Sequence, residues 1–285
     1  MLRNPRDIQA LVYLLLQTGL VILLWQYGFQ PLVYAAVLLL SVGISAAHHN
    51  HAHLRFWHNK YLNRLTDLWL TLLQGHPTFV FHATHNANHH RYHHGPRDAA
   101  RTYRFGGDTN HLSGYLLHPL QAVCVLYPLF IDWLRRLRHR APGVYRHCLL
   151  QYLIIITLWA VLAAIDWQKW LLFVLLPQLH GLHWLLATNY LQHAHADGHS
   201  QLNFSRNFNG LLNLLMFNIG YHTAHHLHPK AHWSTLPALH EQYRLHIHPN
   251  LLAGGLLPYM VRTYLLAPFI PACRSRSLMN HTEEN

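Results

Sequence analysis

Histidine is the residue type that distinguishes this sequence, because it makes up 30 of the 285 residues. The histidines are concentrated in blocks at 48–53, 82–94, 193–195 and 222–226. Spacings of three and four residues recur in these blocks, and on a helix they place two imidazoles on one face about 5–6 Å apart. Imidazoles at that separation can bind one metal ion or two neighbouring ions. The spacing therefore predicts a metal site formed by three sets of residues: His49 and His53; His85, His89 and His90; and His222, His225 and His226.

The number of imidazoles indicates more than one metal ion. A structural zinc ion is saturated by four ligands, whereas the blocks offer eight or more. Imidazoles without a thiolate suit iron, zinc or copper. The three cysteines have no Cys-x-x-Cys spacing, so we do not expect a thiolate zinc site. None of the three glutamates begins a Glu-x-x-His pair, which excludes the carboxylate-bridged di-iron bundle.

The segments that must position these blocks are apolar enough to cross a membrane. Hydrophobic residues account for 51% of the chain and charged residues for 11%, against about a quarter charged residues in an ordinary soluble domain. The stretch 8–54 has no charged residue, and the glycine and proline within 27–31 indicate a turn. We therefore expect a helical hairpin with spans near 9–26 and 31–48, since a span needs about 20 apolar residues. A second hairpin is expected over 148–165 and 170–187, with a turn at 166–169.

Two further apolar stretches, 62–81 and 112–133, are interrupted by polar residues and prolines. We expect both to lie along the membrane surface as interfacial or re-entrant helices. The predicted fold class is an all-α integral membrane protein, with four transmembrane helices in two hairpins, interfacial helices and a cytosolic histidine-rich cap. We expect a single domain to cover residues 1–285.

The distribution of charge predicts which side of the membrane carries the histidines. Lysine and arginine number 21 against 10 acidic residues, so the net charge is +11. With two hairpins, Lys169 is the single basic residue in a far-side turn, and the others adjoin the side of both termini. The positive-inside rule makes that side, and the histidine blocks on it, cytoplasmic. Because these charges border apolar spans, we expect no nucleic-acid partner.

The blocks resemble the histidine boxes of the membrane fatty acid desaturase family, the di-iron integral-membrane enzymes of the bacterial type. The family's HxxxH box is found at 49–53, its HxxxHH box at 85–90 and its HxxHH box at 222–226. The resemblance covers most of the chain, from about residue 43 to about residue 245. These motifs are specific for the superfamily and less specific for desaturation itself.

The resemblance implies a ligand set for two non-heme irons. Asn189 resembles the family's outer-sphere residue, which contacts the metal site through water, and we place it in the catalytic machinery. The implied iron ligands are His49, His53, His85, His89, His90, His193, His222, His225 and His226.

The resemblance also implies a reaction and its partners. Oxygen would be used to remove two hydrogens from a lipid or fatty acyl chain at the membrane, which introduces a C=C bond. The alternatives are a hydroxylase, a ketolase or a decarboxylative alkene-forming enzyme on a lipid, and, from another class, a histidine-rich metal transporter. The chain has no His-Pro-Gly-Gly heme segment. Electrons must therefore come from a separate protein of the ferredoxin or cytochrome b5 type.

The sequence leaves the register of two boxes open. His90, His93 and His94 form a second possible box, although we favour the register that uses His85 and His89. His48 could replace His49, but the interval to Asn63 favours His49.

Other residues near the boxes have two interpretations. Asp98, Asp108 and Asp197 either orient ligand imidazoles through the distal N–H or serve as loop carboxylates and helix caps. His281 lies far from every box in the sequence, and we expect it to be dispensable.

Overall fold

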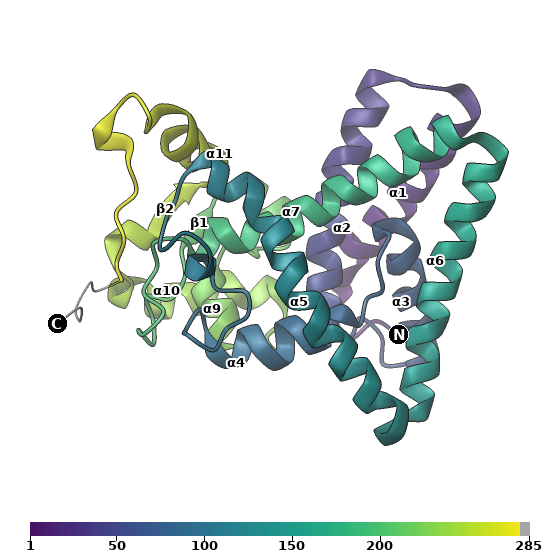
Figure 1. The fold of residues 1–285 in the computed structure, drawn as a ribbon, viewed down its shortest axis with the longest axis horizontal. Helices are drawn as coiled ribbons and strands as arrows, with labels where there is room; N and C mark the ends of the chain where they lie inside the picture. The colour runs from purple at the N-terminus through teal and green to yellow at the C-terminus, as the bar shows by residue number, and fades with distance from the viewer. Residues whose placement is uncertain (280–285) are drawn as a thin grey trace. The chain divides into compact units, whose positions relative to one another are not determined.

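The computed structural model describes residues 1–279 and is mainly helical within them (Figure 1). The chain divides into two compact units. Unit 1 comprises residues 1–82 and 130–185, and unit 2 comprises 83–129 and the described residues from 186 onward. The divisions fall inside α5 (Leu112–Arg140) and α7 (Leu176–His193), so each of these helices contributes to both units. The predicted all-α class is confirmed, whereas a single domain over the whole chain stays a prediction.

In unit 1, α1 (Ile8–Tyr27) and α2 (Pro31–His53) pack together as the predicted first hairpin. Gly28 ends α1 with a φ of 81°, a conformation that residues with a Cβ rarely adopt. Pro31 occupies the first turn of α2, where its missing N–H removes no helical hydrogen bond. The turn signal in the sequence therefore marks the helix ends correctly.

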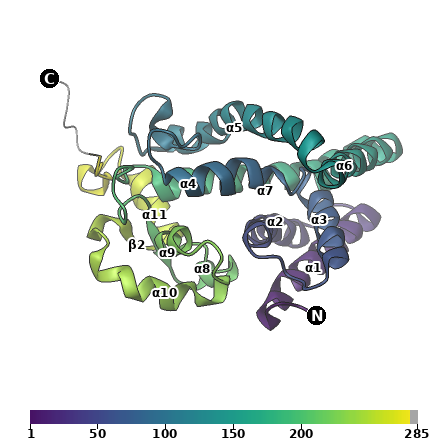
Figure 2. The ribbon, with the colours of Figure 1, turned by 90° about the horizontal axis from the view of Figure 1, so that it is seen from below.

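The third helix of unit 1, α3 (Lys60–Gln74), packs against α1 and α2, and Figure 2 shows the three together. Asn59 caps its start by accepting two backbone hydrogen bonds, and Gly75 ends it with a φ of 71°. Its 15 residues extend about 22 Å, less than the ~30 Å of a bilayer's hydrocarbon core. The helix is thus too short to cross, in agreement with the expectation for 62–81, and its place at the membrane surface stays a prediction.

The two predicted spans of the second hairpin are also helical, with a break between them. The helix α6 (Pro142–Lys169) continues through a π-helical turn at Trp170–Leu175 into α7. The run is broken at Asp166, whose φ of −158° and ψ of 95° are not helical. The Asp166 carboxylate accepts a hydrogen bond from the backbone N–H of Lys169 (3.0 Å), which stabilises the break. The break lies at the predicted turn, 166–169.

Among the residues that the structure describes, four helical runs are long and apolar enough to cross a membrane: Pro5–Tyr27, Pro31–His53, Leu112–Arg140 and Pro142–His193. The last of these contains the break at Asp166, so it accommodates both spans of the second hairpin. The run Leu112–Arg140 is long and apolar enough to be a span, whereas the sequence predicts an interfacial or re-entrant helix over 112–133; its 29 residues continue through two prolines. A proline removes one helical hydrogen bond but does not always end a helix in a membrane. Which of the four runs cross stays a prediction.

A buried carboxylate holds the elements of unit 1 together near the end of α2. Asp67 on α3 accepts hydrogen bonds from Arg55 (2.5 Å) and from the Thr78 hydroxyl (3.2 Å), and His147 on α6 lies 3.4 Å away. Burial alone would raise the pKa of Asp67, but its hydrogen bonds to His147 and His51 and the charge of Arg55 hold it well below the usual value. The carboxylate therefore stays ionised and fixes the chain between α3 and residue 82.

Besides its parts of α5 and α7, unit 2 contains short helices and one small pair of strands. Its two strands, β1 (Asn207–Asn209) and β2 (Leu252–Gly255), run parallel. The π-helical stretch His82–His89 leads into α4 (His90–Tyr92), and α10 (Leu236–Tyr243) packs on α9 (His222–Leu227) (Figure 2). Unit 2 also contains the short helices α8 (Leu211–Leu215) and α11 (Leu256–Met260).

Candidate metal centre

Four histidines of unit 2 converge at one point. They are His89 from the π-helical stretch, His193 from the last turn of α7, and His222 and His226 from α9. All four are buried, and one ring nitrogen of each lies within 4.8 Å of the others. We call these residues the four-histidine cluster. It unites three segments that are far apart in the sequence.

The nitrogen–nitrogen distances within this cluster are short. His222 Nε2 lies 3.0 Å from His193 Nε2 and 3.1 Å from His226 Nε2. Two ring nitrogens approach this closely only with a proton or a cation between them, because their lone pairs otherwise repel. The positions thus fit a shared cation.

Two members of the cluster have a hydrogen-bond acceptor at Nδ1, which sets their tautomer. His89 Nδ1 lies 2.6 Å from the Asp98 carboxylate, and His193 Nδ1 lies 2.7 Å from the Phe204 carbonyl. Both oxygens can only accept, so each Nδ1 carries a proton, and the lone pair of the neutral form of each ring lies on Nε2. Hydrogen bonding of the distal N–H to a carboxylate or a carbonyl is the usual support of a metal-ligating histidine. The cluster is therefore compatible with metal binding.

The charge state of these side chains favours the same interpretation. Burial lowers the pKa of His226 well below its usual value, and the neighbouring imidazoles of His90 and His222 lower it further. Burial alone would raise the pKa of Asp98, but His89 and backbone N–H groups lower it more, so that its pKa lies below the usual range. The His226 imidazole is thus kept neutral, as a metal ligand must be, and the Asp98 carboxylate is kept ionised.

Three more histidines of unit 2 lie beside the cluster. His90 Nε2 is 3.0 Å from both His85 Nε2 and His225 Nε2. The His90 ring stacks on His226 with 4.2 Å between centroids. We call His85, His90 and His225 the three-histidine group. Seven of the nine predicted ligands are thus brought together within unit 2.

The other two predicted ligands, His49 and His53, belong to unit 1. They occupy the last turn of α2, and their ring centroids are 4.9 Å apart, as the i,i+4 spacing predicts. Of the two candidates for this box, His48 has both ring nitrogens occupied, by the Gln74 side chain and by Thr78 O. That arrangement leaves His48 no free nitrogen for a metal and favours His49.

The structure also bears on the alternative register of the second box, which uses His93 and His94. His93 and His94 lie beyond α4 with left-handed φ values of 43° and 66°. The His94 ring stacks on His193 with 5.1 Å between centroids, and burial lowers the pKa of His94 to about 3. Neither residue is among the converging nitrogens of the described clusters, which favours the register with His85 and His89.

Asn189 contacts a different set of groups. Its side-chain amide donates to Ala100 O (2.7 Å) and lies 3.1 Å from His118 Nε2 on α5. A water-mediated contact of Asn189 with the metal site stays a prediction. His118 could not be singled out from the sequence, because it stands alone within an apolar stretch.

The three candidate aspartates divide between the two expected roles. Asp98 orients His89, as described above. Asp108 accepts from the backbone N–H of His195 (3.1 Å), and Asp197 accepts from that of His199 (2.9 Å). Asp108 and Asp197 are therefore loop carboxylates that bind backbone N–H groups. Of the three aspartates, Asp98 is the one that fits the expected role of orienting a ligand imidazole.

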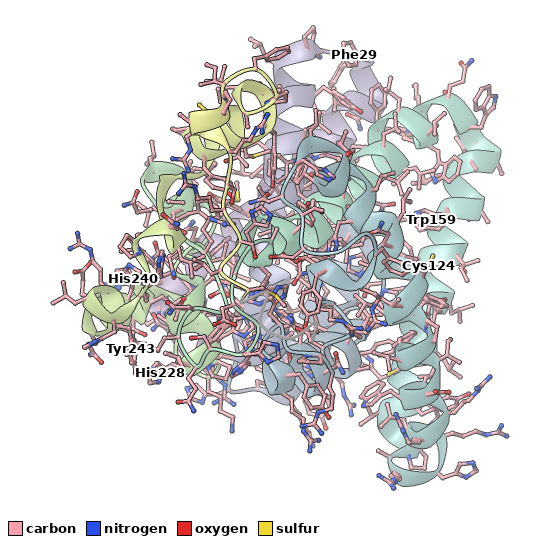
Figure 3. All side chains as sticks on the ribbon, turned by 60° about the vertical axis from the view of Figure 1, so that its left-hand side comes forward. Phe29, Cys124, Trp159, His228, His240 and Tyr243 are labelled. Carbon is pink, nitrogen blue, oxygen red and sulfur yellow. The ribbon has the colours of Figure 1, made fainter. Side chains whose placement is uncertain are left out.

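The packing behind α9 limits movement of its histidines. His228, just after α9, shares a 2.8 Å hydrogen bond with the Tyr243 hydroxyl on α10; both residues are labelled in Figure 3. His240 on α10, labelled there too, packs its ring 4.8 Å from that of Tyr221, directly before α9. Both ends of α9 are therefore tied to α10.

Comparison with known proteins agrees with these observations. The sequence profile described as fatty acid desaturase matches residues 23–253, which is most of the chain and includes all nine predicted ligands. We found no significant match to any individually curated protein. The histidine clusters and the four long apolar helices are both consistent with that match. From the extent of the match, the chain belongs to the fatty acid desaturase family.

Proposed function

We propose that this protein is an oxygen-dependent di-iron desaturase that introduces a C=C bond into a lipid acyl chain. The observation that carries the proposal is the four-histidine cluster, whose buried nitrogens converge in a chain of the desaturase family. Imidazoles without thiolates suit iron, zinc and copper, and the membership of the desaturase family favours iron among them. Bound iron would supply the redox chemistry with oxygen that breaking an unactivated C–H bond requires.

The proposed ligands of the two irons are the nine histidines predicted from the sequence. The four-histidine cluster would hold one iron, and the three-histidine group supplies ligands to the other. His49 and His53 are assigned as ligands by the resemblance of their box. Asn189 is proposed as the outer-sphere catalytic residue.

The chain's own groups have defined tasks in this proposal. Asp98 and Phe204 O keep the protons of His89 and His193 on Nδ1, so that both Nε2 lone pairs are available. The buried setting excludes water, which limits loss of reactive oxygen species to solvent. Apolar helices of spanning length give a lipid chain access without entering water.

We further propose the partners and the orientation in the membrane. Electrons come from a separate ferredoxin or cytochrome b5-type protein, and the histidines and both termini face the cytoplasm. The C-terminal end of α5 supports this orientation, because Arg135, Arg136 and Arg140 there are exposed. An acidic electron donor would be attracted to such a surface.

Lipid profiling tests the proposal directly. We expect cells that express the chain to accumulate an acyl chain with two hydrogens fewer than its precursor, seen by mass spectrometry of the extracted lipids. Cells that express the His226→Ala variant at equal level are the control and should lack the product. Accumulation of oxygenated lipids alone would identify a hydroxylase or ketolase instead. Unchanged lipids with metal uptake would identify a transporter.

A further inference from the structure

The segment 204–207 contacts both α7 and α9, the two helices that carry three of the four histidines of the four-histidine cluster. Its residues contact these helices alternately, Phe204 through its backbone carbonyl and the next three residues through their side chains. Phe204 and Arg206 contact the end of α7, whereas Ser205 and Asn207 contact Thr223 on α9. We propose that Arg206 is a positioning residue, which through this segment sets the place of His193 relative to the histidines of α9. The inference rests on the metal site proposed above.

Arg206 completes the hydrogen bonding of the last turn of α7. The final carbonyls of a helix have no partner within the helix. Arg206 Nη1 donates to Leu191 O (2.8 Å), Nη2 donates to Ala194 O (3.0 Å), and the Arg206 backbone N–H donates to Gln192 O (2.6 Å). One residue therefore holds three carbonyls around His193, and the helix end cannot fray and carry that ligand away.

The surroundings of Arg206 show that its guanidinium has one defined position. The side chain is 1% exposed, although it carries a charge. Its charge lies at the negative end of the α7 dipole and 4.7 Å from the centre of the Tyr259 ring, a favourable cation–π distance. The planar fork of an arginine can serve two carbonyls at once, whereas a lysine offers a point charge on a flexible stem.

The same segment fixes the first turn of α9. Asn207 Oδ1 accepts from the Thr223 backbone N–H (3.0 Å), which lies in the first turn and has no helical partner. Asn207 Nδ2 donates to the Thr223 hydroxyl (2.8 Å), which also shares a hydrogen bond with Ser205 (2.9 Å). Thr223 directly follows His222, so these contacts set the position of that ligand.

The consequence is a fixed separation between ligands on two different helices. Phe204 O binds His193 Nδ1, and the next three residues bind the end of α7 and the start of α9. His193 Nε2 and His222 Nε2 thereby stay 3.0 Å apart. Loss of groups that support metal ligands from behind commonly weakens metal binding about 10- to 100-fold. We expect the same of Arg206, although it contacts no metal.

Cobalt titration of the detergent-solubilised, metal-free full chain tests the inference, because the visible spectrum of Co²⁺ reports its ligand geometry. We expect Arg206→Met to keep the helix content of the wild type but to bind cobalt about 10- to 100-fold more weakly, with an altered spectrum. Arg206→Lys keeps the charge and should recover part of the affinity. The matched control is Arg262→Met, since exposed Arg262 lies 5.8 Å from the same Tyr259 ring and should leave binding unchanged.

Thr223→Val tests the contacts of the segment with α9 and changes the side-chain volume little. It also keeps the inference testable if Arg206→Met does not fold. It removes the hydroxyl that Ser205 and Asn207 bind, and we expect weaker cobalt binding again. Unchanged affinity and spectrum in a folded Arg206→Met, or in Thr223→Val, would overturn the inference while the metal site stands. A wild-type chain that binds no cobalt would overturn the metal site itself, and the inference with it.

Discussion

Replacement of His89 by alanine should abolish lipid oxidation and strongly reduce the iron bound to the purified chain. His89 is one of four buried nitrogens that converge, and no alanine group can replace its lone pair. The carboxylate of Asp98 would also lose its imidazole partner in a buried place, which adds a cost in stability. Iron analysis of the purified protein, with lipid analysis of the same cells, measures both effects.

His225→Ala is expected to act in the same way through the three-histidine group, because His225 Nε2 lies 3.0 Å from His90 Nε2. The control is His199→Ala, since His199 is exposed and lies outside both clusters. It should retain wild-type iron and activity. His281, also expected to be dispensable, lies outside the described residues. Retained activity in both the His89 and His225 variants would refute the ligand assignment.

Asp98→Asn should weaken iron binding about 10- to 100-fold without removing any ligand. Asp98 accepts hydrogen bonds from His89 Nδ1 and from the backbone N–H groups of His94 and Ala100. These three N–H donors are shared between the two carboxylate oxygens of Asp98. An asparagine has one oxygen and one NH₂ group there, so its NH₂ group would face one of the donors. The His89 tautomer would then no longer be set, and its Nε2 would hold a proton in part of the molecules.

The matched control for this variant is Asp197→Asn. Asp197 accepts from the His199 backbone N–H and contacts no ring of the two histidine clusters in the described structure. Competition with an iron chelator measures the affinity of each variant. Equal affinities for Asp98→Asn and Asp197→Asn would contradict the orienting role of Asp98.

Much of the helical architecture could be predicted from local signals. Gly28 and Pro31 mark the first hairpin because their backbone preferences act within a few residues. The turn at Asp166 was likewise predictable from polar residues between two apolar runs. The length of α5 was not, because a stretch with prolines at 119 and 128 favours an interfacial or re-entrant helix over 112–133, whereas the helix continues through both prolines to Arg140. Whether a proline ends a helix depends on neighbouring groups that a sequence pattern does not contain.

The convergence of the candidate ligands in unit 2 was predictable from the sequence, but the groups that support them were not. Helical spacing indicated that His222 and His226 share a face, and the structure agrees. The support of His193 comes from the carbonyl of Phe204, and any residue type could supply a carbonyl. The role of Arg206 depends on the end of a helix formed earlier in the chain. Backbone contacts between distant segments have no signature in residue type, so they required the structure.

The most direct test of the central claim is metal analysis of the purified wild-type chain combined with X-ray absorption at the metal edge. The account predicts two irons per chain, each surrounded by nitrogen and oxygen scatterers with the multiple-scattering pattern of imidazole. It also predicts oxygen consumption when a reduced electron donor and a lipid are supplied. Zinc in place of iron with no oxygen consumption, or sulfur among the metal's neighbours, would contradict it.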